Sequence, residues 1–132
     1  MSDPSVGFGP LMEAAKSALS AGNFAEAEAL YARALGTGEQ LHGTDDLSLV
    51  SALTGLGTTR VLSGRAEAGE PVLTRALAIS ETRLGAGHPN VALLLNELSR
   101  LYLKQSAYSF AEPLLMRLLA LKRAKGVTAT CR

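Results

Sequence analysis

The chain has 132 residues, which is enough for one domain of ordinary size. Apolar residues make up 47% of it and tryptophan is absent, while alanine and leucine are abundant, as is typical of a helical protein with a substantial core. The 13 basic and 12 acidic residues leave a net charge of +1, which gives no electrostatic argument for binding nucleic acid or an anionic membrane.

The amino-terminal stretch MSDPSVGFGPLMEAAK has no basic region followed by an apolar run, so it does not read as a secretory signal. No stretch approaches the roughly 18 apolar residues that a membrane span requires. The single cysteine, Cys131, has no internal partner for a disulfide, which favours a reducing compartment. We therefore expect a cytoplasmic protein.

The first predicted helical hairpin covers residues 10–45. Its first helix begins near Pro10 and ends near Asn23, and its second helix begins at Phe24. Asn23 is followed three residues later by Glu26, which resembles a capping box at the start of the second helix.

The second predicted hairpin covers residues 46–87. Asp45 and Asp46 precede its first helix, where a carboxylate can cap free backbone N–H groups and interact with the helix dipole. The pattern breaks at Gly64 and resumes near Ala66, which indicates a second antiparallel helix.

The third predicted hairpin covers residues 88–124. His88 can act as a polar cap, and Pro89 suits the first helical turn because its missing N–H has no partner there anyway. The short polar stretch KQSAY ends this helix, and the last helix begins near Tyr108.

The three hairpins are copies of one another at a spacing of 42 residues. Four triples of identical residues coincide at this spacing: Glu28, Glu70 and Glu112; Arg33, Arg75 and Arg117; Leu11, Leu53 and Leu95; and Leu35, Leu77 and Leu119. So many matches in one register indicate a repeat protein. The predicted domain therefore covers residues 10–124, with flexible tails at residues 1–9 and 125–132.

The order of small and large apolar residues resembles the tetratricopeptide pattern W-x₂-L-G-x₂-Y…A-x₃-F…A. In the second copy the matching residues are Leu53, Leu56, Gly57, Gly69, Leu73 and Ala76. The segments LGAGHPNVA (84–92) and YSFAEPLLMRLL (108–119) are similar to the LG…HP.VA and Y..AEPLL.RAL segments of the kinesin light chain type of repeat. That type also matches the 42-residue spacing, and the resemblance covers about residues 10–124.

This resemblance implies an all-α fold, a right-handed superhelix of three antiparallel helix pairs. In such an α-solenoid the first helix of each pair lines a concave groove and the second helix forms the convex back. Arrays of this family bind peptides or proteins and rarely catalyse reactions, so a protein or peptide partner is expected.

We expect the outward positions of the three first helices to line the groove. These positions are Met12 and Lys16 in the first repeat, Thr54, Thr58, Val61 and Leu62 in the second, and Leu93, Asn96, Arg100, Leu103 and Lys104 in the third. Asn96, Arg100 and Lys104 recur every four residues and share one helix face. An asparagine can hold peptide backbone and the two cations can pair with acidic groups, which favours an acidic partner. The alternative is that these three residues form a solvated polar stripe.

The last helix is more apolar than one buried stripe requires, because residues 114–121 read LLMRLLAL. We expect the surplus to form an interface that includes Leu114, Met116, Leu118 and Leu121. Its occupant could be a second copy of the chain, further repeats of a longer parent, or a client protein.

Neither catalytic residues nor a metal or cofactor site are expected. His42 and Asp46 have a spacing that can hold a metal on one helix face, but a helix boundary separates them. Cys131 has no rigid setting that would lower its pKa. The chain is therefore expected to be no enzyme.

Two functions are consistent with this sequence. The first is a non-catalytic adaptor that binds a peptide or protein through the groove, the apolar terminal helix, or both. The alternative is a self-assembling scaffold whose main partner is another copy of itself.

Overall fold

The computed structural model describes residues 4–130, and it describes side chains between residues 8 and 124. In this part of the chain every regular element is a helix, and no strand occurs. In chain order the elements are α1 (Pro4–Ser20), α2 (Phe24–His42), the short 3₁₀ helix η1 (Leu47–Leu49), α3 (Val50–Leu62), α4 (Ala66–Leu84), α5 (Pro89–Lys104) and α6 (Tyr108–Thr130). The predicted all-α architecture of three helix pairs is confirmed.

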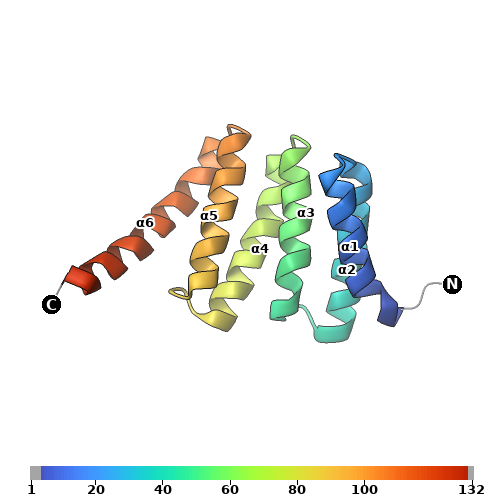
Figure 1. The fold of residues 1–132 in the computed structure, drawn as a ribbon, viewed down its shortest axis with the longest axis horizontal. Coiled ribbons are helices and arrows are strands. Elements are labelled where there is room, and N and C mark those ends of the chain that lie inside the picture. Colours follow the sequence, from blue (N-terminus) through green and yellow to red (C-terminus); the bar gives the residue numbers. More distant parts are fainter. Residues whose placement is uncertain (1–3, 131–132) are drawn as a thin grey trace.

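The three pairs stand side by side in a row, and the chain passes along the row from one end to the other (Figure 1). Between the pairs, α2 packs against α3 and α4 packs against α5. The first helices also contact each other in succession, α1 with α3 and α3 with α5. This is an open solenoid of stacked hairpins and not a closed bundle. The right-handed sense of the superhelix stays a prediction.

The turn inside each pair has the same backbone geometry in all three repeats. Gly22 (φ 82°), Gly64 (φ 89°) and Ser106 (φ 58°) hold its left-handed position. The N–H of the residue that follows donates to a carbonyl in the last turn of the first helix, as from Asn23 to Ala18. This is a Schellman motif, which satisfies the free carbonyls of the helix end. The breaks predicted at these places are confirmed.

Side-chain caps mark the starts of the second and third pairs. Asp46 Oδ1 accepts a hydrogen bond from the Ser48 N–H at 2.9 Å, and His88 Nδ1 accepts one from the Asn90 N–H at 3.0 Å. Both caps agree with the sequence prediction. The capping box predicted at Asn23 is wrong, because Asn23 has a ψ of 76° and its side chain makes no capping bond. An N-cap residue normally has an extended backbone, which aims its side chain at the helix.

Both ends of the described chain are helical beyond the predicted domain limits. Since α1 begins at Pro4, helix occupies residues 4–9 of the segment predicted as a tail. Pro4 can occupy a first helical turn, and Phe8 is half-buried against the first core cluster, which favours this early start.

At the other end α6 continues to Thr130, so helix also occupies residues 125–130 of the segment predicted as a tail. The two outermost segments, residues 1–3 and residues 131–132 with Cys131, lie outside the described part of the chain.

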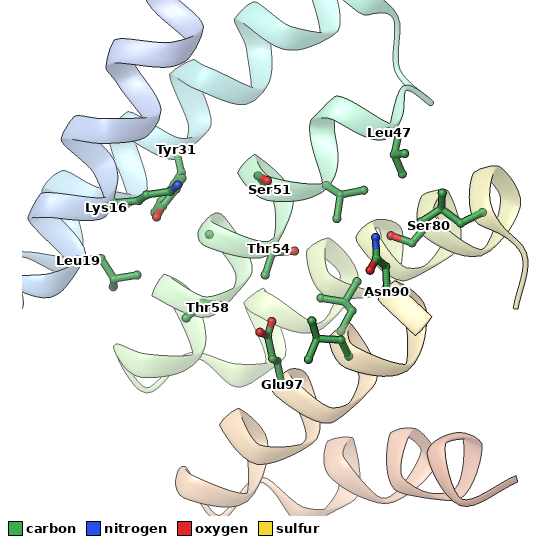
Figure 2. Close-up of a pocket in the computed structure, with 15 residues that line it drawn as sticks. Lys16, Leu19, Tyr31, Leu47, Ser51, Thr54, Thr58, Ser80, Asn90 and Glu97 are labelled. Atoms are coloured by element: carbon green, nitrogen blue, oxygen red, sulfur yellow. The ribbon is translucent and has the colours of Figure 1, made fainter. Parts of the chain in front are cut away.

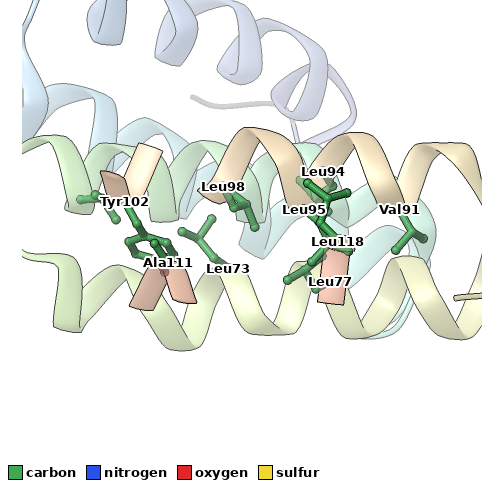
Figure 3. Close-up of a cluster of buried hydrophobic side chains, with 10 residues drawn as sticks. Leu73, Leu77, Val91, Leu94, Leu95, Leu98, Tyr102, Ala111 and Leu118 are labelled. Atoms are coloured by element: carbon green, nitrogen blue, oxygen red, sulfur yellow. The ribbon is translucent and has the colours of Figure 1, made fainter. Parts of the chain in front are cut away.

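Within residues 8–124 the core consists of three clusters of buried side chains. The cluster of α1, α2 and α3 is made mostly of small residues: Met12, Ala15, Ala18, Ala27, Tyr31, Ala34, Ala52 and Leu56. The largest cluster joins α3, α4, α5 and α6 through Val61, Leu73, Leu77, Val91, Leu94, Leu95, Leu98, Tyr102, Ala111 and Leu118 (Figure 3). A third cluster of Leu49, Leu53, Ala76 and Ile79 links η1 and α3 to α4.

An ion pair recurs between the second helices of successive pairs. Arg75 Nη2 lies 2.7 Å from Glu39 Oε2, and Arg117 forms the equivalent pair with Glu81. The repeat in the sequence is therefore also a repeat of contacts. Each pair is partly exposed, so each contributes no more than about 1 kcal/mol to stability.

Candidate partner-binding groove

The first helices line a groove that consists of two adjoining cavities. One has a volume of about 660 Å³ and extends from α1 across α3 to α5. The other, of about 690 Å³, lies between α3 and the later part of α5. Thr54, Thr58 and Glu97 line both cavities, so the two share a boundary. Figure 2 shows the first cavity, with Lys16 and Tyr31 on one side and Asn90 on the opposite side.

The middle of the first cavity is polar and belongs to α3. Ser51, Thr54 and Thr58 follow one another at helical spacing and face the same side (Figure 2). Gly55 lies against Tyr31, and a Cβ atom at this position would be 2.2 Å from the tyrosine ring. The glycine therefore lets a side chain of α2 reach the groove. Burial raises the pKa of Tyr31, so its hydroxyl stays protonated and can donate a hydrogen bond.

Thr54 has a hydroxyl group that its own helix leaves unsatisfied. The hydroxyls of Thr59, Ser80 and Ser99 donate to carbonyls one helical turn earlier, at 2.8, 3.0 and 2.7 Å. Thr54 Oγ1 is buried and has no hydrogen-bond partner in the described part of the chain. Threonine has two accessible rotamers in a helix, so a rotation can turn this hydroxyl toward a ligand. A ligand amide that paired with it would remove the cost of an unsatisfied buried group.

The charges of the groove are mostly positive. Lys16 lies in the first cavity, and Arg100 and Lys104 lie in the second. Glu97 is the one carboxylate among the residues that line the described groove, and it stands where the two cavities meet. The groove therefore has cations toward both ends and an acidic group between them.

Apolar side chains separate these polar groups. Leu93 is 57% exposed, Leu103 is 40% exposed and Leu47 is 39% exposed, and all three line the groove. Exposed leucines between polar side chains can hold the apolar side chains of an extended ligand.

Seven of the eleven residues predicted for the groove line it: Lys16, Thr54, Thr58, Leu93, Arg100, Leu103 and Lys104. Leu62 and Asn96 are half-buried and line neither cavity. The predicted stripe of Asn96, Arg100 and Lys104 is therefore reduced to its two cations.

The predicted positions of Met12 and Val61 in the groove are wrong, because these side chains are 7% and 0% exposed. Met12 belongs to the first core cluster, on the same inner stripe of α1 as Ala15. Val61 is buried because α3 and α4 come unusually close together. Its Cγ2 atom would lie 2.9 Å from a Cβ placed on Gly69, so α4 covers it.

The sequence prediction missed the groove residues that come from outside the first helices. Tyr31 reaches the groove from α2, Ser80 and Leu84 reach it from α4, and Leu47 reaches it from η1. Gly55 is the signal that could have indicated Tyr31, since a glycine inside a helix often marks a close approach.

The predicted interface on α6 is partly wrong. Leu118 is 7% exposed, and Leu114 and Leu121 are half-buried against the same core cluster. They lie on the inner face of α6, which packs on the rest of the protein. Of the predicted set, Met116 is exposed, at 62%. Among residues 108–124, the other large apolar side chains that are exposed are Tyr108, Leu115 and Leu119.

The described residues contain no group of three or more His, Cys, Asp or Glu side chains placed to hold a metal ion. Among the helices of residues 4–130, none is long and apolar enough to cross a membrane.

Stacked helical hairpins of 42 residues, with a groove along their first helices, define a class of repeat protein. The family model described as tetratricopeptide repeat matches residues 10–82 and again residues 51–124. The chain belongs to the tetratricopeptide repeat family.

Two solved structures show the same fold, and both are of a Podosopora anserina protein with nearly identical TPR-like repeats of the kinesin light chain type. One of them is of a variant with a single glutamine replaced by methionine. Each aligns with 93% of this chain at 21% sequence identity and a TM-score of 0.71. The predicted tetratricopeptide repeat is confirmed, and the likeness to these two structures shows that the fold is shared. This chain spans 57% and 58% of the length of those two chains. A comparison with curated proteins finds no match.

Proposed function

We propose that this protein is a non-catalytic, cytoplasmic adaptor that binds an extended acidic segment of a partner protein in the groove of α1, α3 and α5. Tetratricopeptide repeats are in general protein–protein interaction modules, because stacked hairpins create a long concave surface. The charge of the groove carries the proposal. Lys16, Arg100 and Lys104 line it, and among the described residues that line it Glu97 supplies the one carboxylate.

The other groups of the groove suit an extended backbone. The hydroxyls of Ser51, Thr54 and Thr58 and the phenol of Tyr31 can pair with peptide N–H and C=O groups. Leu93 and Leu103 can pack against apolar side chains between the acidic ones. Arg100 and Lys104 form charge-assisted hydrogen bonds with carboxylates, and such bonds are stronger than neutral ones.

A display library of random peptides tests this proposal directly. The protein should select peptides rich in Asp and Glu. Arg100→Glu combined with Lys104→Glu should weaken the binding of a selected peptide by at least ~10-fold, because it places like charges against the ligand. Isothermal titration calorimetry measures the affinity, and circular dichroism confirms that the variant is folded.

Arg33→Glu combined with Arg123→Glu is the matched control. It changes the net charge by the same amount, and both arginines are exposed and line neither cavity. The control should keep the affinity. An equal loss in both variants would mean that overall charge, and not the groove, governs binding. Selection of peptides without acidic residues would refute the proposed partner chemistry.

A further inference from the structure

The outer face of α6 is equivalent to a surface that the two preceding repeats bury. Leu115 occupies the repeat position of Leu73 and Tyr31, which are 1% and 3% exposed, yet Leu115 is 38% exposed. Leu119 occupies the position of Leu77, which is 3% exposed, and of Leu35, which is half-buried, yet Leu119 is 45% exposed. In the inner repeats the next hairpin packs at this face, whereas α6 lies at the end of the row (Figure 1). Among residues 8–124, the α6 face therefore has the position of a stacking surface but no hairpin packed on it.

The α6 face has the spacing of a coiled-coil seam. Its exposed residues Tyr108, Glu112, Leu115, Leu119 and Lys122 follow one another in steps of four, three, four and three. This is the heptad spacing at which one helix packs along another. A different set of α6 residues packs on the core. The α6 face can therefore pack against a second helix without disturbing the fold.

The α6 face is complementary to itself, in charge and in apolar contact, when two copies of α6 run antiparallel. In an antiparallel pair, a step of three residues back along one helix is a step of three residues forward along the other. Placing Leu115 of one copy opposite Leu119 of the other therefore also places Glu112 opposite Lys122. Two leucine contacts then form the centre of the contact, and an ion pair closes it at each end. None of the ion pairs formed between residues 8 and 124 uses Glu112 or Lys122.

Head-to-tail stacking of copies is disfavoured, because it would not reproduce the contacts that recur between the repeats. The repeated ion pair between second helices requires a glutamate at the position of Glu39 and Glu81, but α6 has Arg123 there. A copy stacked in line would bring Arg33 to Arg123, since Arg33 is the counterpart of Arg75. It would also place Glu13, the counterpart of Gly55, toward the open leucines.

We infer that the outer face of α6 joins two copies of this chain in a two-fold symmetric dimer. The two α6 helices pack antiparallel, with Leu115 against Leu119 of the second copy and Glu112 paired with Lys122 of the second copy. A symmetric contact of this kind uses the same patch twice and closes after two subunits. The dimer leaves the groove open and presents two grooves, which would strengthen binding to a partner that carries two matching segments.

Charge exchange tests this register. Sedimentation velocity measures the dimer dissociation constant of the full chain over a wide range of concentrations. Glu112→Lys alone, or Lys122→Glu alone, places like charges at both ends of the contact and should weaken the dimer by about 10-fold. The double variant restores both pairs in reversed order and keeps the net charge of the wild type, so it should recover most of the affinity.

Leu115→Asp tests the apolar centre. It would bury a carboxylate without a partner at two symmetric places, so the dimer should dissociate at least ~100-fold more readily. Leu115 is partly exposed in one chain, so the variant should keep its fold, which thermal melting and circular dichroism verify. Leu119→Asp is the second variant for this purpose.

Three results would overturn the proposed dimer. A wild-type chain that stays monomeric at every concentration would exclude the dimer. A double charge variant that binds no better than the single ones would exclude the antiparallel register. Self-association that survives Leu115→Asp and Leu119→Asp would place the contact elsewhere. The groove proposal is tested by peptide binding and is independent of these outcomes.

Discussion

The two junctions between successive repeats share one frame but differ in chemistry. At the first junction, Tyr31 packs on Gly55 within a cluster made mostly of alanines. At the second junction, the cluster is built mostly of leucines and includes Tyr102, whose ring also packs within the third hairpin, with its centroid 5.5 Å from that of Phe110. The same 42-residue unit is therefore stacked through close backbone approach in one place and through large side chains in the other.

One repeat position makes the difference clear. At the first junction Glu28 accepts a hydrogen bond from Arg60 Nε at 2.9 Å and forms a second ion pair with Arg65. At the second junction the equivalents of Glu28 and Arg60 are Glu70 and Tyr102. Tyr102 is 2% exposed, and burial, with the nearby charge of Glu70, raises its pKa. A partly exposed ion pair and a buried aromatic ring thus fill equivalent places.

The comparison teaches that the second junction depends on burial and the first on fit and charge. Burial of large apolar side chains is the stronger contribution, since a partly exposed ion pair contributes about 1 kcal/mol at most. The energetic weight of the stack should therefore lie between α3 and α6, and substitutions at equivalent positions should have unequal effects.

Truncation of Tyr102 should have the largest effect. Tyr102→Ala removes a buried ring from the main cluster and should lower the free energy of unfolding by about 3–5 kcal/mol. Arg60→Ala, at the equivalent position of the second repeat, should cost about 1 kcal/mol. Urea denaturation of the two variants measures both values, and equal losses would refute the proposed difference between the junctions.

A methyl group at Gly55 should have the next largest effect. Gly55→Ala places a Cβ 2.2 Å from the Tyr31 ring, so the helices must separate, and the expected loss is about 1–3 kcal/mol. Gly36→Ala is the control, because a Cβ there has no neighbour within 4 Å, and alanine in a helix should stabilise by about 0.5–1 kcal/mol. A neutral Gly55→Ala would show that the first junction tolerates a wider spacing.

The dependence of stability on acidic pH should also distinguish the junctions, but by a smaller amount than the two substitutions above. Hydrogen bonds from Arg65 and from Arg60 hold the pKa of Glu28 below its ordinary value of 4.5. The folded state therefore binds fewer protons there than the unfolded chain does, and the contribution is complete above the unfolded pKa and lost as the pH falls through the folded pKa.

Wild type should consequently lose more stability than Glu28→Gln as the pH falls through and below the ordinary glutamate value of 4.5, whereas the two should run parallel at higher pH. Chemical denaturation at several pH values measures the difference. Parallel curves throughout the acidic range would mean that the ion pairs of Glu28 contribute nothing measurable.

The fold could be predicted from the sequence because the repeat displays its pattern three times. The breaks near Gly22 and Gly64 and the caps at Asp46 and His88 depend on local backbone chemistry, which a sequence reports directly. The start of α1 at Pro4 was not evident, because Phe8 supports it through a contact with the distant core cluster.

The groove was predictable only where helical periodicity decides exposure. Lys16 and Arg100 follow from spacing along one helix. The burial of Val61 could not be predicted in this way, because it depends on how closely Gly57 and Gly69 allow α3 and α4 to approach each other. Tyr31 was missed for the same reason, since its access to the groove depends on a glycine of another helix.

The smallest predicted effect concerns Glu97, which is the counterpart of Gly55 at the second junction. Where the first junction has a bare backbone that lets Tyr31 into the groove, the second has an exposed carboxylate at the boundary of the two cavities.

Glu97→Gln keeps the size of the side chain and removes a charge that would repel an acidic ligand. It should tighten the binding of an acidic peptide by roughly 2- to 5-fold and leave the free energy of unfolding unchanged within about 0.5 kcal/mol. Calorimetric titration in low and high salt measures the effect, which should shrink with added salt because it is electrostatic. A loss of affinity would instead mean that Glu97 contacts a donor on the ligand, and the second junction would then contribute a specific acceptor to a groove that is otherwise basic.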